Sequence, residues 1–217
     1  MDFTRFFARP DFKHGVYLEE YKEITCHEPI RRLPFPSTLI IPLSQHKGSP
    51  SSLLVKPGQE VVRGEPIAKA NGYFSVPQHA PATGKIERIA LMPTAHGPKT
   101  ESIILHVYEG STQEVLYENP LNIENMKPSE IIDAVQDAGM VGLGGAAFPT
   151  HAKMKSPPEH KVDVVIANGC ECEPYLTCDH RIMLEHTDQL IVGIRIVMRA
   201  LQAKRAIIGV EDNKMDA

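Results

Sequence analysis

Hydrophobic and polar positions along the chain follow two different periods, which divide the sequence into two halves. Residues 34–108 contain short β-type runs separated by turn signals rich in proline and glycine. Short strands at this close spacing predict a small sandwich or barrel. In residues 128–217, helical and strand patterns alternate instead. Residues 109–127 are polar enough to connect the two halves, and residues 1–33 form an N-terminal extension.

The second half predicts a crossover of strands and helices. A helix is expected between Ser129, a suitable N-cap, and Gly139, a suitable residue just beyond a helix end. Residues 161–167 and 206–210 predict buried strands, and residues 187–201 predict an amphipathic helix between them. This βαβ order predicts the start of a parallel, Rossmann-like α/β domain. Because two parallel strands do not complete such a domain, the chain is expected to be a fragment.

The first half also carries a pattern known from carrier domains. Residues 55–68 read V-K-P-G-x-x-V-x-x-G-x-x-I-A, and residues 80–86 read A-P-x-x-G-K-I, which resembles a biotinyl/lipoyl-type barrel-sandwich hybrid. Carriers of that fold present a modified lysine on a hairpin shortly before the A-P pair. In this chain Tyr73 stands there, and Lys69 is out of register. The expected fold class is therefore α+β/mixed, with a barrel-sandwich hybrid that lacks a modifiable lysine and serves structure or docking.

Composition restricts the function class. A formal net charge of −4 at pH 7, with 42% hydrophobic and 23% charged residues, is ordinary for a soluble globular protein and argues against a nucleic-acid binder. The N-terminus lacks the apolar core of a secretory signal, and the apolar stretches are too short to span a bilayer. The chain is therefore expected to be intracellular, with any membrane association supplied by a partner.

A glycine-rich motif follows the first predicted helix. It reads G-M-V-G-L-G-G-A-A-F-P-T over residues 139–150. Gly142, Gly144 and Gly145 let the backbone turn tightly and approach a ligand, and Lys153 adds a positive charge. A phosphate cradle is therefore one interpretation. Because the spacing matches neither the dinucleotide-binding nor the Walker A pattern, a plain turn stays open as the alternative.

A polar motif follows the predicted strand at 161–167. Residues 168–181 read N-G-C-E-C-E-P-Y-L-T-C-D-H-R and include Asn168, Glu171 and Glu173. The carboxyl end of a strand is where α/β proteins place ligand contacts, so these side chains are candidates for binding. A solvated loop without a ligand is the alternative.

Three of the four cysteines lie in the polar motif, which is unlike a disulfide framework and favours a reducing compartment. A metal site is a minority interpretation that would use Cys170, Cys172, Cys178 and His180. Structural zinc sites usually use a C-x2-4-C knuckle, which this C-x-C spacing does not provide. The metal interpretation predicts that zinc or iron copurifies with the protein, which a metal assay tests.

In their order and amino-acid sequence, the two motifs resemble the C subunit of the bacterial Rnf electron-transport complex. The residues that carry the resemblance are G-L-G-G-A-A-F-P-T-x-x-K and N-G-x-E-x-E-P-Y-L-T-x-D-H-R, joined by F-K-H-G-V-Y-L-E-E-Y-K-E-I-T and I-I-P-L-S-Q-H nearer the N-terminus. The motifs are more distantly similar to those of the flavin- and NADH-binding subunit of respiratory complex I, which read G-R-G-G-A-G-F-P-T and N-A-D-E-G-E-P. This chain differs from the latter at Leu143, Ala147 and Cys170.

The resemblance implies a role for each candidate residue at an FMN and NAD(H) site. Gly142, Gly144 and Gly145 would line FMN, and Lys153 would lie near its polar edge or phosphate. Asn168 and Glu171 would contact the isoalloxazine side of FMN. Phe148 would stack on the nicotinamide side, and Glu173 would lie beside bound NADH. None of these roles follows from spacing alone.

The resemblance also implies a reaction and a setting. Hydride would pass between NAD(H) and FMN, with ferredoxin as electron partner of an ion-translocating complex. [4Fe-4S] clusters are expected only in a C-terminal region absent from this sequence, which has no C-x-x-C-x-x-C-x-x-x-C-P run. The implied location is the cytoplasmic face of the bacterial inner membrane, held peripherally by the other subunits. A non-catalytic docking module of the same complex, or a paralogous flavin/iron–sulfur reductase, is the alternative.

Overall fold

The computed structural model describes residues 18–95, 97–116, 121–155 and 161–217. The chain divides into two units. The larger unit comprises residues 32–167 and 191–207. The smaller unit comprises the residues up to 31 together with 168–190 and 208–217, so it gathers three segments that are separated in the sequence.

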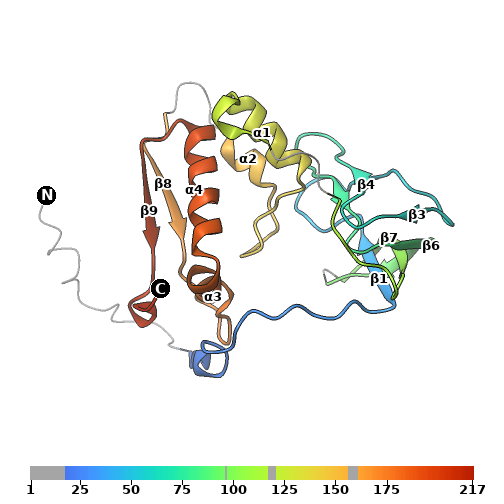
Figure 1. The fold of residues 1–217 in the computed structure, drawn as a ribbon, viewed down its shortest axis with the longest axis horizontal. Coiled ribbons are helices and arrows are strands. Elements are labelled where there is room, and N and C mark those ends of the chain that lie inside the picture. The colour runs from blue at the N-terminus through green and yellow to red at the C-terminus, as the bar shows by residue number, and fades with distance from the viewer. Residues whose placement is uncertain (1–17, 96, 117–120, 156–160) are drawn as a thin grey trace, which may run out of the picture. The chain divides into compact units, whose positions relative to one another are not determined.

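The first half of the chain folds into two antiparallel sheets within the larger unit (Figure 1). Their strands are β1 (Thr38–Pro42), β2 (Ser52–Leu53), β3 (Glu60–Val61), β4 (Pro66–Lys69), β5 (Gln78–His79), β6 (Gly84–Pro93) and β7 (Lys99–Val107). One sheet has the order β1-β7-β6-β3, and the other has the order β2-β4-β5. The sandwich expected from the closely spaced strand and turn signals is therefore present.

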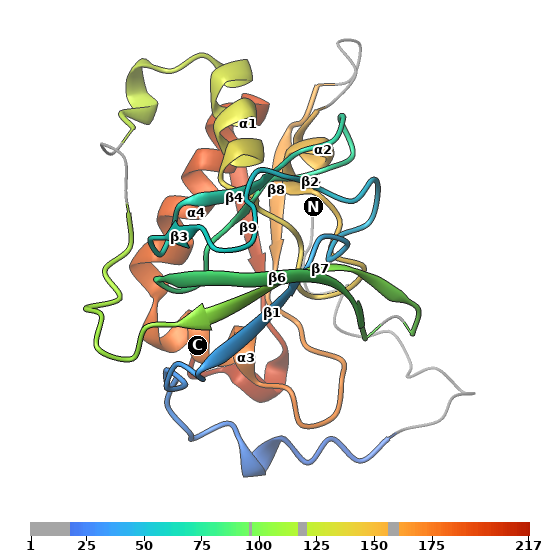
Figure 2. The same cartoon turned by 90° about the vertical axis from the view of Figure 1, so that its right-hand side faces the viewer.

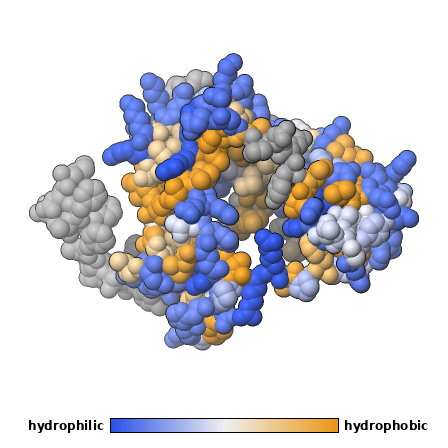
Figure 3. All heavy atoms as spheres, viewed as in Figure 1, coloured by the Kyte–Doolittle hydropathy of each residue, from blue (hydrophilic) through white to orange (hydrophobic). Residues whose placement is uncertain are grey.

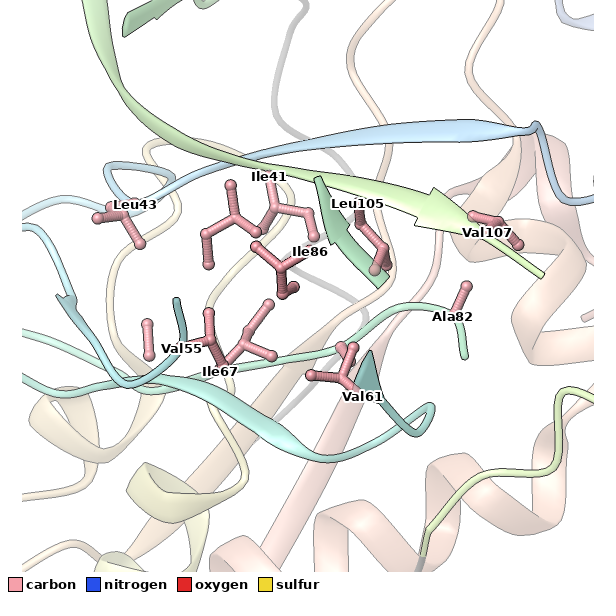
Figure 4. Close-up of a cluster of buried hydrophobic side chains, with 12 residues drawn as sticks. Ile41, Leu43, Val55, Val61, Ile67, Ala82, Ile86, Leu105 and Val107 are labelled. Atoms are coloured by element: carbon pink, nitrogen blue, oxygen red, sulfur yellow. The ribbon is translucent and has the colours of Figure 1, made fainter. Parts of the chain in front are cut away.

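The long strands β6 and β7 form the central pair of the first sheet (Figure 2). Their register runs from Gly84 opposite Val107 to Pro93 opposite Lys99, with one irregularity after Ile86. Isoleucine, leucine and valine side chains of the strands and their connections pack with three alanines into one cluster (Figure 4). Full burial of each of the larger side chains contributes about 1.5–3 kcal/mol, so this cluster stabilises the sandwich. Its members are Ile41, Leu43, Val55, Val61, Ile67, Ala68, Ala80, Ala82, Ile86, Ile103, Leu105 and Val107.

Three helices pack around a second, smaller core. They are α1 (Pro128–Asp137), α2 (Thr150–Met154) and α4 (Thr187–Leu201), with the short 3-10 helix η3 (Ile123–Asn125) ahead of α1. Ile131, Met154 and Ala200 form the buried centre of this core, one from each helix. The helix predicted over residues 187–201 is confirmed as α4, and Ala200 is its buried residue.

The start of α1 differs from the sequence prediction. Pro128 is its first residue and Lys127 is the N-cap, so the expectation of Ser129 as N-cap is wrong. The Glu130 carboxylate accepts a hydrogen bond from the Lys127 N–H at 2.7 Å, which satisfies a donor at the helix start. The predicted helix end is confirmed, because Gly139 follows α1 with a φ of 72°, in the left-handed region that favours glycine.

Two strands of the second half form a separate small sheet. They are β8 (Val164–Asn168) and β9 (Arg205–Gly209), and their arrows point the same way in Figure 1. Each strand has an exposed apolar side chain, since Ile166 is 69% and Ile207 is 55% exposed. Figure 3 shows apolar surface in the region where these strands are drawn in Figure 1. The two predicted strands are confirmed, but the expectation that they are buried is wrong, because neither has a buried residue. A Rossmann-like parallel sheet is not confirmed, since a pair of strands does not establish one.

The smaller unit contains one helix that the sequence patterns did not predict. This helix, α3 (Cys178–Glu185), lies within the polar motif that was interpreted as a loop. The 3-10 helices η2 (Lys22–Ile24) and η4 (Asp212–Lys214) belong to the same unit. The polar motif is therefore a loop followed by a helix start, a local geometry that places its side chains differently from a solvated loop.

Candidate functional site

The glycine-rich motif forms a closed loop in the larger unit, between α1 and α2. The Gly142 N–H donates to the Phe148 carbonyl at 3.0 Å, and Val141 and Pro149 form an antiparallel bridge at the base of the loop. The residues at the crest of the loop, 143–146, are exposed. The motif is therefore a hairpin-like loop with an accessible crest rather than a buried turn.

The crest of this loop combines open backbone with a positive charge. A Cβ built on Gly144 or Gly145 would meet no described atom within 4 Å, so a ligand can approach the backbone there. A Cβ on Gly142 would lie 3.3 Å from the Lys153 Nζ, which places that ammonium against the loop. Lys153 itself is an exposed residue of α2. Accessible glycine backbone beside an ammonium group fits a phosphate group.

Two other features of the loop bear on the sequence interpretation. The Phe148 ring packs edge-on against the Phe74 ring, with centroids 6.0 Å apart. Ala147, which stands where the complex I motif has glycine, adopts a φ of 49°. A left-handed conformation costs an alanine about 1–2 kcal/mol, so the backbone keeps the shape that glycine favours despite the substitution.

The polar motif lies in the smaller unit, where Glu171 holds the start of α3. Glu171 is only 4% exposed. Its carboxylate accepts hydrogen bonds from the Asp179 N–H at 2.9 Å, the His180 N–H at 3.1 Å and the Cys178 thiol at 3.1 Å. The two N–H groups are donors that a helix leaves unsatisfied at its N-terminus. Glu171 therefore caps α3 from seven residues upstream of its first residue.

The same contacts determine the charge state of the motif. Burial by itself raises the pKa of Glu171, but the hydrogen bonds from Asp179, Cys178 and His180 outweigh it and hold the pKa below the ordinary glutamate value. Burial raises the pKa of Asp179, and the neighbouring charges of Glu171 and Glu173 act in the same direction. The motif therefore holds a firmly ionised glutamate at its centre, and Asp179 gains a proton more readily than usual.

The remaining two candidates of this motif are placed differently. The Asn168 side-chain oxygen accepts from the Cys170 N–H at 3.2 Å, which folds that side chain back on its own loop. Glu173 is exposed. The eight predicted residues thus fall into two groups, with Asn168, Glu171 and Glu173 in the smaller unit. The others, in the larger unit, are Gly142, Gly144, Gly145, Phe148 and Lys153. Their predicted contacts with FMN and NADH stay predictions.

The ligand set considered for a metal is not brought together. Among the described residues, the one group of three or more histidine, cysteine and carboxylate side chains with ligand atoms all within 4.8 Å of one another is Glu171, Cys178 and Asp179. His180 instead bonds Asp216 through Nε2 at 2.9 Å. Because the Glu171 oxygens already accept hydrogen bonds from α3, these distances give the metal interpretation no support.

Two buried basic side chains support the motifs and were missed by sequence reasoning. Lys22 is 5% exposed, donates to the Glu171 carbonyl and lies 3.9 Å from the Glu211 carboxylate. His151 is 1% exposed and lies two residues before Lys153. A lone lysine or histidine carries no spacing signal, so local patterns could not have indicated either one.

Known proteins match nearly the whole chain. Residues 10–109 match the family described as the RnfC barrel sandwich hybrid domain, and residues 135–217 match the Nuo51 FMN-binding domain. The C subunit of the proton-translocating ferredoxin:NAD(+) oxidoreductase complex of Clostridium ljungdahlii is 39% identical over 207 residues, which cover 95% of this chain. The chain is similar to the C subunit of Rnf-type complexes over nearly its whole length. This confirms the resemblance that the two motifs carried.

Two further C subunits match to a similar extent. The C subunit of the Na(+)-translocating ferredoxin:NAD(+) oxidoreductase complex of Acetobacterium woodii is 39% identical over 206 residues, and that of the ion-translocating oxidoreductase complex of Haemophilus influenzae is 38% identical over 208 residues. This chain covers 45%, 46% and 32% of the Clostridium, Acetobacterium and Haemophilus proteins, less than half of each. In the parts of the chain that the structure describes, no helix has the length and apolar character needed to cross a membrane.

Proposed function

We propose that this chain is part of an FMN- and NADH-binding electron-transfer subunit of an Rnf-type ion-translocating ferredoxin:NAD oxidoreductase complex. The observation that carries the proposal is the glycine-rich loop, which lies inside the segment that matches an FMN-binding domain. The exposed backbone of Gly144 and Gly145 beside the Lys153 ammonium suits the phosphate of FMN. The names of the relatives support the electron partners, ferredoxin and NAD, and the association with other subunits.

The proposed roles are those that the resemblance to the Rnf subunit implies. Gly142, Gly144 and Gly145 line the flavin nucleotide, and Lys153 neutralises its phosphate. Phe148 offers an aromatic ring for stacking on the nicotinamide side, since planar rings bury a large area with a defined geometry.

The acidic motif contributes the remaining proposed contacts. Glu173, an exposed residue whose carboxylate can face a ligand, lies beside bound NADH. Asn168 and Glu171 stay proposed contacts on the isoalloxazine side, although the Glu171 carboxylate already accepts three hydrogen bonds within its own unit.

FMN supplies the hydride and single-electron chemistry, whereas the protein binds and orients the two nucleotides and excludes water.

The electron acceptors and the location in the cell belong to the same proposal. Electrons would leave through [4Fe-4S] clusters of the longer protein, which would lie peripherally on the cytoplasmic face of the bacterial inner membrane. Such a position is compatible with the lack of a membrane-crossing helix among the described residues.

The test is flavin retention followed by reduction. The purified chain is mixed with excess FMN, desalted, and its visible spectrum recorded before and during an anaerobic titration with NADH. We expect retained flavin that NADH bleaches, and slower bleaching with the flavin still bound in Glu173→Gln. The matched control is Glu19→Gln, which changes an exposed glutamate outside both motifs. A folded chain that retains no flavin would contradict the proposal for these residues and favour the docking-module alternative.

A further inference from the structure

The hairpin that carries the modified lysine in carrier domains is anchored in this protein. It connects the antiparallel strands β4 and β5, and its tip comprises residues 71–76, here called the carrier tip. The backbone carbonyl of Tyr73, the residue at the lysine position, lies 2.7 Å from His151 Nε2. The Ser75 carbonyl accepts a second hydrogen bond from the Gln136 side chain at 3.1 Å. Two carbonyls of the tip are thus bonded to α1 and α2, the helices on either side of the glycine-rich loop.

The carrier tip also contacts the glycine-rich loop itself. The Phe74 ring packs edge-on against Phe148 at the end of the loop. The segment that contains Lys47 and Gly48 is bound to the same loop, because the Lys47 N–H donates a hydrogen bond to the Ala147 carbonyl at 3.2 Å. A Cβ on Gly48 would lie 1.9 Å from the Phe74 carbonyl oxygen, so these segments approach as closely as backbone allows. The contacts join the barrel-sandwich fold to the loop and to the helices on both sides of it.

His151 is the residue through which this anchoring reaches Lys153. A carbonyl oxygen can only accept a hydrogen bond, so His151 Nε2 carries a proton and donates it to the Tyr73 carbonyl. The ring is 1% exposed and lies edge-on to the Tyr73 ring at 5.3 Å. Both His151 and Lys153 belong to the short helix α2. Fixing the His151 side chain therefore fixes the helix that presents the Lys153 ammonium to the loop.

We propose that the carrier tip is a positioning element for the cofactor loop, with His151 as its positioning residue. The proposal rests on the proposed function, because the loop matters only if it binds FMN. In carrier domains this hairpin holds the swinging arm. Here the hairpin is held in one position, and the Tyr73 carbonyl, at the position of the carrier lysine, anchors it. A loop held in place before binding loses less conformational entropy when a phosphate arrives, which increases affinity.

The test compares His151→Ala and His151→Gln in the full chain. Glutamine can present an N–H to the Tyr73 carbonyl in place of Nε2, whereas alanine cannot. FMN affinity is measured by fluorescence quenching, and hydrogen exchange at the Gly142 amide reports the order of the loop without any ligand. The control Ile103→Val creates a small cavity in the barrel core, where Ile103 is fully buried, and so lowers stability without touching the tip.

We expect His151→Ala to weaken FMN binding about tenfold, as loss of a buried hydrogen bond does, and to speed exchange at Gly142. His151→Gln should recover most of both effects, and Ile103→Val should change neither. Unchanged affinity and exchange in His151→Ala would overturn the inference, as would an equal effect of Ile103→Val. If the unaltered chain binds no FMN, the proposed function fails, while the exchange comparison still decides whether the tip orders the loop.

Discussion

Replacing Glu171 by glutamine separates structural from cofactor-binding roles within one motif. Glu171 and Glu173 are two residues apart in the sequence, yet Glu171 is buried against α3 and Glu173 is exposed. Glutamine keeps the size of the side chain but removes its charge and turns one of its two acceptor oxygens into a donor. The matched variant Glu173→Gln makes the same chemical change where no helix end depends on it.

The hydrogen bonds to Glu171 indicate the size of the effect. One carboxylate oxygen accepts from the Asp179 N–H and the Cys178 thiol, and the other from the His180 N–H. Hydrogen bonds to a charged group contribute about 1.5–3 kcal/mol, and a buried donor left without a partner costs about 1–3 kcal/mol. We therefore expect Glu171→Gln to lower the free energy of unfolding by about 2–4 kcal/mol. The exposed Glu173→Gln should change it by no more than about 0.5 kcal/mol.

The loss should depend on pH in a defined direction. The pKa of Glu171 lies below its ordinary value in the folded chain, so the carboxylate stabilises the fold above the unfolded-state value of about 4.3. This contribution is lost as the pH falls through the folded-state pKa. The difference between the unaltered chain and Glu171→Gln should therefore be full at neutral pH and shrink as the pH falls below the unfolded-state value and through the lower folded-state pKa.

Urea unfolding followed by far-UV circular dichroism measures these differences, and hydrogen exchange at the α3 amides localises them. Equal unfolding midpoints for Glu171→Gln and Glu173→Gln would refute the assignment of Glu171 as the cap of α3. So would a destabilisation of Glu171→Gln that stays constant as the pH is lowered. In either case the ionised carboxylate would not be what holds the helix start.

Two further pairs of variants test the packing and the loop. Gly169→Ala should destabilise the chain by about 1–3 kcal/mol in urea unfolding, because its Cβ would lie 3.0 Å from the Gly209 carbonyl oxygen, a backbone atom, and 2.8 Å from the Met183 sulfur. Gly193 lies inside α4 with no described atom within 4 Å of an added Cβ, so Gly193→Ala should stabilise the chain by about 0.5–1 kcal/mol. Equal effects would contradict the packing at Gly169. Lys153→Ala should weaken FMN binding about tenfold in fluorescence titrations, and Lys155→Ala should have little effect, since the Lys155 ammonium lies over the Tyr73 ring instead. Similar losses in both variants would indicate that general positive charge, and not the position of Lys153, binds the phosphate.

Local pattern predicted most elements because their signals lie within the elements themselves. The strands β8 and β9 and the helix α4 follow from β-branched runs and from apolar residues at helical spacing. Gly139 marked a helix end because only a residue tolerant of positive φ suits that position. The helix α3 was missed because its cap, Glu171, lies outside the window in which capping residues are normally sought.

By itself, the sequence determined the carrier-like pattern without its lysine and the resemblance to the C subunits of Rnf-type complexes. Order and spacing of short motifs are properties of the sequence alone, so these conclusions needed no coordinates. Only the tertiary structure decided what the individual side chains do. Tyr73 and His151 are 78 residues apart, and Lys22 and Glu171 are 149 apart, so no local pattern relates them. Their roles depend on burial and hydrogen-bond partners, which exist only once the chain has folded.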